Sequence, residues 1–316
     1  MKAARDRGIY TSVMLFEGWA MQHAPGAWAH HPFHPRSHVN GLTVDIDGDG
    51  NGLELYTLKN PAVTAVQEAS VRHVIETVNE FDNVLYEISN ENHPGSTEWQ
   101  YHFIRFVKDR EAKLRKQHPV GMTFQYKGGK NQALFDSPAD WISPNPDGGY
   151  KDNPPVADGR KVIFNDIDHL WGLGGDVAWV WQSFLHGMNV LFMDPYDSVV
   201  LKQDPESKWE AVRRNLGYTR RYAERVNLTA MTPRPELAST GWCLANAAEK
   251  KAEYLVFSPA PGRVTVNLAA TRRHLKVEWF NPATGEATPG RVVDGGGSVE
   301  LAAPFTGDAV VSLSGK

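Results

Sequence analysis

The sequence lacks the marks of several protein classes. It has one cysteine, Cys243, among 316 residues, so a disulfide within the chain is excluded and the compartment stays open. Its apolar runs are far shorter than a membrane span requires. Residues 1–6 are not followed by the apolar segment of a signal peptide. We therefore expect no membrane association, and the sequence assigns no localisation.

The charges have no dominant sign. The formal net charge is −4, and the lysines and arginines form no basic block of the kind that nucleic-acid-binding proteins carry, so we expect no nucleic-acid partner. With 41% hydrophobic and 22% charged residues, the chain can form one large core and a smaller second domain. Its ten tryptophans suit stacking on sugar rings, although most tryptophans simply fill cores.

The most informative stretch is 83–92, with the sequence NVLYEISNEN. Its apolar half is typical of a buried strand, and the polarity changes abruptly at Ser89. Side chains alternate along a strand, so Glu87 and Glu91 share a face. Two inward carboxylates are unfavourable unless they are paired or used in chemistry. The stretch predicts a functional carboxylate at the C-terminal end of a strand, as in α/β barrels, with a solvated loop glutamate as the alternative.

Strands and helices alternate through residues 1–232, which predicts parallel βα units. One helix should begin with Asn60 as N-cap and Pro61 in its first turn. Its expected apolar stripe comprises Val63, Val66, Val74, Val78 and Phe81. The expected strands are 8–16, 83–92, 120–124, 141–143, 161–164 and 189–193.

The loop 21–58 is rich in histidine and aspartate. Its histidines match no metal-ligand spacing, and we interpret the loop as lining a substrate site. The segment DIDGDGNGLE, which begins at Asp45, resembles the start of an EF-hand loop. Position twelve is Tyr56, however, where calcium loops need a bidentate glutamate, so calcium is a minor alternative. We expect no metal and no cofactor.

Beyond Pro233 the pattern changes to short alternating runs between turns rich in Gly, Pro and Asn, which predicts an all-β sandwich. We therefore expect two domains, a catalytic domain over 1–232 and an accessory domain over 233–316. The expected strands of the second are 254–257, 264–268, 275–280, 298–301 and 309–313.

Several stretches resemble known enzymes. YEISNEN resembles strand four of the clan A glycoside hydrolases, whose barrels place an Asn-Glu pair at the end of that strand. EWFNPATGE and APFTGDAVVSL resemble the small C-terminal β domain, named for collagen binding, of a family of bacterial glycosidases. NDIDHLWGLGG and MDPYD are similar to parts of the same family. The resemblance covers nearly the whole chain.

This resemblance implies an α/β fold of the TIM-barrel type and hydrolysis of O-glycosidic bonds in a carbohydrate. In the clan, the Glu of the pair is the general acid/base and the preceding Asn binds the sugar 2-hydroxyl, which implies these roles for Glu91 and Asn90. The second carboxylate is normally a glutamate at the end of strand seven. Here that position offers Asp166 and Asp168, of which we favour Asp166.

The shorter aspartate leaves the carboxyl separation open, so retention, which the clan implies, and inversion both remain. Further polar and aromatic residues follow expected strands and are candidates for sugar binding. For His169, Asp194 and Tyr196 a structural role is an equal alternative. The predicted substrate-binding set is Glu17, Trp19, Asn90, His169, Trp171, Asp194 and Tyr196.

The clan's barrel has eight strands, and we count about six. We expect an incomplete barrel that lacks two βα units before residue 8, with unpaired edges at 8–16 and 189–193. A homo-oligomer that covers these edges is predicted, and a truncated, poorly active chain is the alternative.

Glycoside hydrolysis is thus the leading hypothesis. One alternative is a carbohydrate-binding protein on a degenerate barrel without turnover, suggested by the aspartate at strand seven and the missing strands. Another is a metal-dependent hydrolase that uses Asp166, Asp168, His169 and the histidines of loop 21–58. The sequence names neither the sugar nor the linkage.

Overall fold

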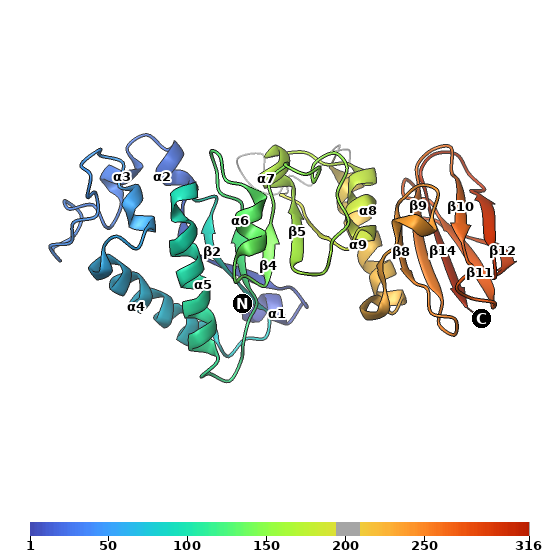
Figure 1. Ribbon diagram of the computed structural model, residues 1–316, viewed down its shortest axis with the longest axis horizontal. Helices are drawn as coiled ribbons and strands as arrows, with labels where there is room; N and C mark the ends of the chain where they lie inside the picture. The colour runs from blue at the N-terminus through green and yellow to red at the C-terminus, as the bar shows by residue number, and fades with distance from the viewer. Residues whose placement is uncertain (194–208, 316) are drawn as a thin grey trace. The chain divides into compact units, whose positions relative to one another are not determined.

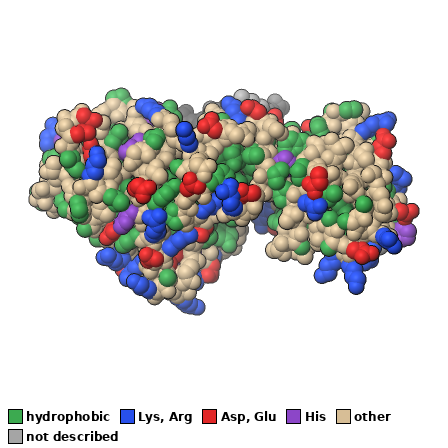
Figure 2. Space-filling model, in the orientation of Figure 1, with side chains coloured by type: hydrophobic (Ala, Val, Ile, Leu, Met, Phe, Trp, Pro, Cys, Tyr) green, Lys and Arg blue, Asp and Glu red, His purple; other side chains and the backbone are tan. Residues whose placement is uncertain are grey.

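The computed structural model describes residues 1–193 and 209–315, which form two compact units, Met1–Asn145 and Pro146–Lys316. Blue to green ribbon marks the first unit in Figure 1, and the colours from green to red mark the second. Positive and negative side chains are interspersed over the face drawn in Figure 2. Within the two described ranges, no helix combines the length and apolar character needed to cross a bilayer.

A parallel sheet of four strands, paired in chain order, forms the centre of the first unit. Its second strand is buried on both faces, at Val84, Tyr86 and Ile88 on one and at Glu87 and Ser89 on the other, as expected where helices and loops cover the sheet. The register pairs Glu17 with Asn90, so the polar C-terminal ends of two adjacent strands meet at the carboxyl end of the sheet. The strands are β1 (Thr11–Glu17), β2 (Val84–Asn90), β3 (Val120–Thr123) and β4 (Trp141–Ser143).

Two long helices, α4 (Pro61–Val78) and α5 (Thr97–Glu111), lie side by side in this unit (Figure 1). The start of α4 is as predicted, because the Asn60 side chain accepts hydrogen bonds from the Ala62 and Val63 amides. The shorter helices are α1 (Lys2–Arg5), α2 (Trp19–His23), α3 (Ala27–His30), η1 (Leu53–Tyr56), η2 (Pro94–Ser96) and α6 (Asn131–Asp136).

The expected apolar stripe of α4 is wrong at Val66, which is 41% exposed. A polar residue, Gln67, lies on the buried face instead. Its amide donates to the Leu55 carbonyl (2.9 Å) and accepts from the Trp99 indole (3.0 Å). Burial of this glutamine is tolerated because both ends of its side chain are hydrogen-bonded.

The second unit begins with a parallel pair, β5 (Val162–Asp166) and β6 (Asn189–Leu191). Its helices are α7 (Ile167–Trp171), α8 (Val177–Leu185) and α9 (Glu210–Arg225), with short turns η3 (Leu228–Ala230) and η4 (Pro235–Leu237). Apolar side chains from α8 and α9, including Trp181 and Tyr222, pack against Phe257 and Phe280 of the β-rich part. The helices therefore share this cluster with the β-rich part, which also contains a separate core cluster of its own.

The β-rich part consists of antiparallel strands, as the alternating runs predicted. Six of them pair in the order β12-β11-β14-β9-β8-β7, and β10 pairs with β13. Their bounds are β7 (Thr232–Pro233), β8 (Cys243–Asn246), β9 (Glu253–Ser258), β10 (Arg263–Asn267), β11 (His274–Phe280), β12 (Ala287–Asp294), β13 (Ser298–Ala302) and β14 (Ala309–Gly315).

The predicted fold class is confirmed: parallel strands alternate with helices, and an antiparallel β part follows them. Each of the six strands expected before residue 232 has a counterpart, four in the first unit and two in the second. The predicted domain boundary between 232 and 233 lies inside the second unit, and it stays a prediction.

Candidate active site

Glu91 follows β2 directly, at the polar edge of the sheet in the first unit. It is 7% exposed, and its backbone φ is 39°. Among the described residues, Glu91 and Lys127 are the non-glycine residues with a positive φ. A backbone held in such a conformation costs about 1–3 kcal/mol and is found preferentially at functional sites. The turn after β2 therefore holds a buried carboxylate in an unfavourable backbone conformation.

Neighbouring segments hold this turn in place. The Gln22 side chain donates to the Glu91 carbonyl (2.9 Å), and the Glu91 amide lies 3.4 Å from the Thr123 hydroxyl. At Gly18 a Cβ atom would lie 2.6 Å from Asn92, so only glycine lets the end of β1 approach the turn this closely. The close approach between the two strand ends thus depends on Gly18.

Two of the predicted sugar-binding residues, Glu17 and Asn90, meet at this carboxyl end of the sheet. Asn90 Nδ2 donates to Glu17 Oε2 at 3.4 Å, and the other oxygen of Glu17 accepts from the Ala20 amide (3.0 Å). The Asn90 carbonyl accepts from the Gly18 amide at 3.0 Å. The first unit therefore brings together Glu17, Asn90 and Glu91.

An aromatic group lies next to these polar residues in the chain. Trp19, the first residue of α2, is 42% exposed, and its ring stacks on His23 with centroids 4.5 Å apart. His23 in turn contacts Tyr126 edge to face at 4.5 Å, and the Tyr126 amide donates to the Asn92 carbonyl (3.0 Å). The sequence interpretation missed Gln22 and Tyr126. The polar residues that follow strand 120–124 were a signal for Tyr126.

A pocket of about 430 Å³ opens beside the end of β1 in the first unit. Glu17 and Tyr56 line it together with His30, His31 and Phe33 of loop 21–58. Its volume is in the range of small-molecule sites, about 300–1,000 Å³. Burial lowers the pKa of His31, which favours its neutral form. Residues of loop 21–58 therefore line a pocket, and the binding of substrate by this loop stays a prediction.

In the second unit, the candidate carboxylates lie where β5 passes into α7. Asp166 ends β5 and caps α7, because its Oδ1 accepts a hydrogen bond from the Asp168 amide at 3.0 Å. Burial raises the pKa of Asp166 to about 6, with a further contribution from the Asp168 charge, while the bond from the Asp168 amide opposes the rise. Burial also raises the pKa of Asp168.

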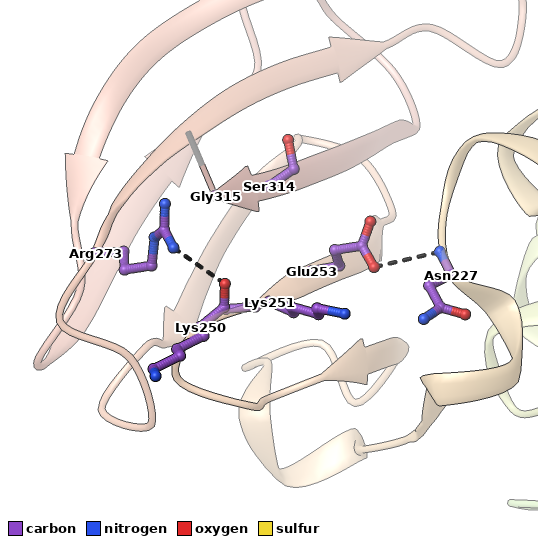
Figure 3. A pocket seen from close by; sticks show the side chains of 8 residues that line it. Asn227, Lys250, Lys251, Glu253, Arg273, Ser314 and Gly315 are labelled. Atoms are coloured by element: carbon purple, nitrogen blue, oxygen red, sulfur yellow. Dashed lines mark hydrogen bonds between the residues drawn. The ribbon is translucent and has the colours of Figure 1, made fainter.

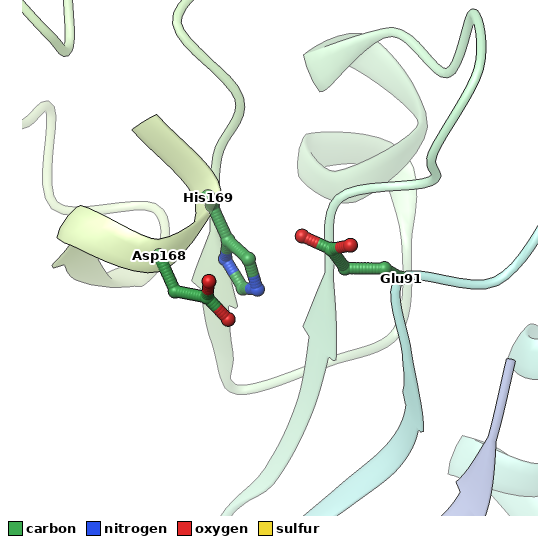
Figure 4. Close-up of side chains that lie close together, drawn as sticks. All are labelled: Glu91, Asp168 and His169. Atoms are coloured by element: carbon green, nitrogen blue, oxygen red, sulfur yellow. The ribbon is translucent and has the colours of Figure 1, made fainter. Parts of the chain in front are cut away.

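His169 follows in the same short helix. Its Nδ1 lies 4.0 Å from Asp166 Oδ2, and burial lowers its pKa to about 4. The imidazole is therefore neutral at pH 7. Figure 4 draws Asp168 and His169 on α7, and Glu91 on the turn that follows β2.

The remaining predicted residues differ in how they are held. Trp171 ends α7, with its ring edge to face against Trp179 at 5.1 Å and the Lys151 ammonium 5.3 Å from its centroid. These contacts hold Trp171 within its own unit. Asp194 and Tyr196 lie outside the described residues.

A second pocket, of about 360 Å³, lies in the β-rich part and includes none of the candidate residues (Figure 3). Glu253 accepts there from the Asn227 amide (3.3 Å), and Arg273 donates to the Lys250 carbonyl (3.1 Å). Among its described lining residues, Glu253 is the one carboxylate, so the pocket lacks a carboxylate pair. The lining comprises Asn227, Lys250, Lys251, Ala252, Glu253, Arg273, Ser314 and Gly315.

Residues 242–311 match a family model described as "Putative collagen-binding domain of a collagenase". No curated protein matches the chain. Its fold is similar to that of a glycoside hydrolase family 5 protein from Bacteroides vulgatus, with a TM-score of 0.63 and 11% identity over 99% of this chain and 72% of that one.

Two further solved structures have a similar fold. Another glycoside hydrolase gives a TM-score of 0.63 at 11% identity, over 100% of this chain and 75% of that one. An α-amylase from Geobacillus thermoleovorans gives 0.51 at 11% identity, over 100% and 79%. At such identities the likeness shows the fold alone. The chain has a TIM-like α/β fold similar to the folds of these glycoside hydrolases, followed by an antiparallel β part.

Proposed function

We propose that this protein is a glycoside hydrolase that cleaves O-glycosidic bonds with two carboxylates. Glu91 is the general acid/base, and Asp166 is the second carboxylate. The observation that carries the proposal is Glu91 itself: a buried carboxylate after Asn90, at the polar end of a parallel strand, on a backbone with φ of 39°. The similar folds, which are named glycoside hydrolase and α-amylase, support the reaction class.

The residues near Glu91 suit a sugar. The bond from Asn90 to Glu17 is long, at 3.4 Å, so the amide can instead donate to a hydroxyl of the substrate. The half-exposed Trp19 ring offers an apolar face for a sugar ring. The substrate of the proposed reaction is therefore a carbohydrate bound at the edge formed by the ends of β1 and β2.

The second carboxylate has to be ionised to act as a nucleophile or base. With a pKa of about 6, Asp166 is mostly ionised at pH 7. In the proposed reaction Glu91 protonates the leaving oxygen while the Asp166 carboxylate bonds to the anomeric carbon and displaces the leaving group. Water, deprotonated by Glu91, then displaces Asp166 and releases the sugar. We propose the retaining course that the clan implies, and the anomeric form of the first product distinguishes it from inversion.

The test is Glu91→Gln on an aryl glycoside with a poor leaving group. Loss of a general acid lowers turnover by about 10²–10⁴. Glu98→Gln is the matched control, because Glu98 is an exposed glutamate in the first turn of α5. Circular dichroism and thermal melting show that both variants are folded. Near-wild-type turnover by folded Glu91→Gln would refute the assignment.

A second candidate function is carbohydrate binding without turnover. It is favoured by one observation: the Asp166 carboxylate already serves as the N-cap of α7, a structural role that needs no chemistry. A panel of glycosides followed by calorimetry and product analysis separates the two functions. If the protein binds glycosides but forms no product from any of them, carbohydrate binding without turnover is favoured.

We propose in addition that residues 233–316 act as an accessory module and carry no catalytic group. The pocket in this part, with its single carboxylate among the described lining residues, supports that division. An essential carboxylate or histidine in this part, shown by a folded but inactive variant, would overturn it.

A further inference from the structure

Three carboxylates converge in the loop that precedes η1. One side-chain oxygen each from Asp45, Asp47 and Asp49 lies within 4.8 Å of the others. Asp45 Oδ2 also accepts from the Gly50 amide (3.1 Å), and Asp47 Oδ1 accepts from the Asp49 amide (3.2 Å). Clustered acids repel one another, and exposed clusters are common, so this geometry alone identifies no ligand.

A fourth carboxylate, Glu54 of η1, points to one. Glu54 is 7% exposed, and its Oε2 has no hydrogen-bond partner among the described residues. Its carboxyl lies within hydrogen-bonding reach of the Asp47 carboxyl. A buried carboxyl oxygen that accepts no hydrogen bond is unfavourable unless a cation lies beside it.

A second unsatisfied oxygen belongs to the same loop. Asp45 Oδ1 is buried and, in the part of the chain that the structure describes, has no hydrogen-bond partner. Three carboxylates of the loop and one of η1 thus lie near one another, and two of their buried oxygens accept no hydrogen bond. A set of carboxylate oxygens, with no histidine or cysteine among the ligands, matches the preference of calcium for six to eight oxygen ligands.

The path of the chain explains how the loop departs from the EF-hand pattern. Counted from Asp45, position twelve is Tyr56, and its side chain is buried with the hydroxyl donating to the Glu17 carbonyl (2.5 Å). The helix η1 begins at Leu53 and instead places Glu54, at position ten, beside Asp47. A carboxylate thus reaches the loop from a position two residues earlier than in an EF-hand.

We propose that Asp45, Asp47, Asp49 and Glu54 bind one calcium ion that fixes this loop to η1. The ion has a structural role, because η1 contacts the edge of the sheet where Glu17 and Glu91 lie. Tyr56 donates to the Glu17 carbonyl, and His93 Nε2 lies 3.1 Å from the Leu53 carbonyl. Calcium therefore stabilises the first unit and orders the segment behind the candidate site.

The test is thermal melting of the full chain with calcium chloride, magnesium chloride or a chelator. Calcium at 100 times its dissociation constant should raise the folded-to-unfolded ratio about 100-fold, and the melting temperature should rise with concentration. Magnesium should give a smaller shift, because it loses its waters reluctantly. These readouts do not depend on enzymatic activity.

Terbium provides a direct probe of the site. Trp28 packs against Gly52, where an added Cβ would lie 2.3 Å from the indole, so an indole next to the loop can sensitise terbium luminescence. We expect luminescence on excitation of tryptophan, and its loss when calcium competes. Trp28→Phe should reduce the luminescence while the calcium-dependent melting shift remains.

Variants locate the site. Asp47→Asn and Asp49→Asn change exposed side chains, so they should fold, and each should weaken calcium binding at least tenfold. Asp109→Asn on the exposed face of α5 removes the same charge elsewhere and should bind calcium normally. The proposal is overturned if wild type shows no calcium-dependent shift at millimolar calcium, if magnesium acts equally, or if the shift persists in both loop variants.

Discussion

The side-chain amide of Gln22 donates a hydrogen bond to the backbone carbonyl of Glu91, at 2.9 Å. The same amide donates to the Gly18 carbonyl at 3.1 Å. Gln22 belongs to α2, which follows β1, whereas Glu91 follows β2. One side chain thus joins two strand ends and holds the carbonyl of a residue with positive φ.

We expect Gln22→Ala to lower kcat about tenfold or more, because a misplaced catalytic group reacts poorly. Loss of the hydrogen bonds should also lower the free energy of unfolding by about 1 kcal/mol. Steady-state kinetics and urea unfolding measure the two effects. Gln132→Ala, at an exposed position of α6, is the control and should change neither. A Gln22 variant that is less stable but has unchanged kcat would show that Gln22 does not position Glu91.

Asp166→Asn should abolish most of the turnover while α7 stays folded. Asparagine is as good an N-cap as aspartate, so the substitution keeps an acceptor for the Asp168 amide and removes only the charge. The expected loss is at least about 100-fold. Asp168→Asn is compared side by side. If only the Asp168 variant is inactive, Asp168 is the second carboxylate, and if both are active, the two-carboxylate mechanism does not apply.

The acidic limb of the pH profile should lie near the Asp166 pKa of about 6. Activity needs the ionised carboxylate, so kcat/KM should rise with pH through that value. We would measure kcat/KM from pH 4 to 8 and follow the carboxyl carbon by NMR. An acidic limb at pH 4, the ordinary range of aspartate, would contradict the expectation.

The pKa shifts of Asp166 and His169 make the stability of the fold depend on pH in opposite directions. The pKa of Asp166 is raised in the folded state, so its contribution is present below about pH 4 and is lost as the pH rises to about 6. The pKa of His169 is lowered to about 4, so its contribution is present above about pH 6.5 and is lost as the pH falls to about 4. When the pH is raised from 4 to 6, the free energy of unfolding should therefore fall less for Asp166→Asn than for wild type.

Phe280→Ala should destabilise the second unit by about 3–5 kcal/mol, because the ring is buried between α8, α9 and the antiparallel sheet. Its centroid lies 5.9 Å from that of Trp181 and 5.3 Å from that of Tyr222. Val292→Ala, at an exposed position of β12, is the control. Guanidinium unfolding followed by tryptophan fluorescence measures both variants. An unchanged midpoint for Phe280→Ala would mean that this shared core contributes little.

We predict that the chain forms a homo-oligomer through β1. Within the described residues β1 pairs with β2 alone, and Tyr10 and Met14 on or beside it are 65% and 46% exposed. An unpaired edge with exposed apolar residues favours pairing with another chain. Light scattering after size exclusion gives the mass, and Met14→Lys should reduce association. A fully active monomer at low micromolar concentration would refute the prediction.

Local sequence patterns, each spanning a few residues, were sufficient to predict much of the fold. The strand at 83–92 was recognisable because burial on both faces requires an apolar run, and it forms as β2. Asn60 and Pro61 set the start of α4 through contacts inside one turn. By contrast, β7, β8 and β12 were not predicted: β12 because most of its residues are exposed and carry no alternating apolar signal, and β7 and β8 because they are only two and four residues long. Local patterns therefore miss strands that are exposed and strands that are too short to show a period.

For the candidate site, the position of Glu91 after an apolar strand indicated a functional carboxylate, and the resemblance to clan A glycoside hydrolases implied roles for Asn90 and the two aspartates. Which side chains converge was decided by the tertiary structure. The positive φ of Glu91, the bond from Gln22 and the placement of Glu54 beside Asp47 depend on contacts between segments separated in the chain or on the path of a turn. Periodicity encodes which residues are buried, whereas only the packed chain determines which buried polar atoms face one another.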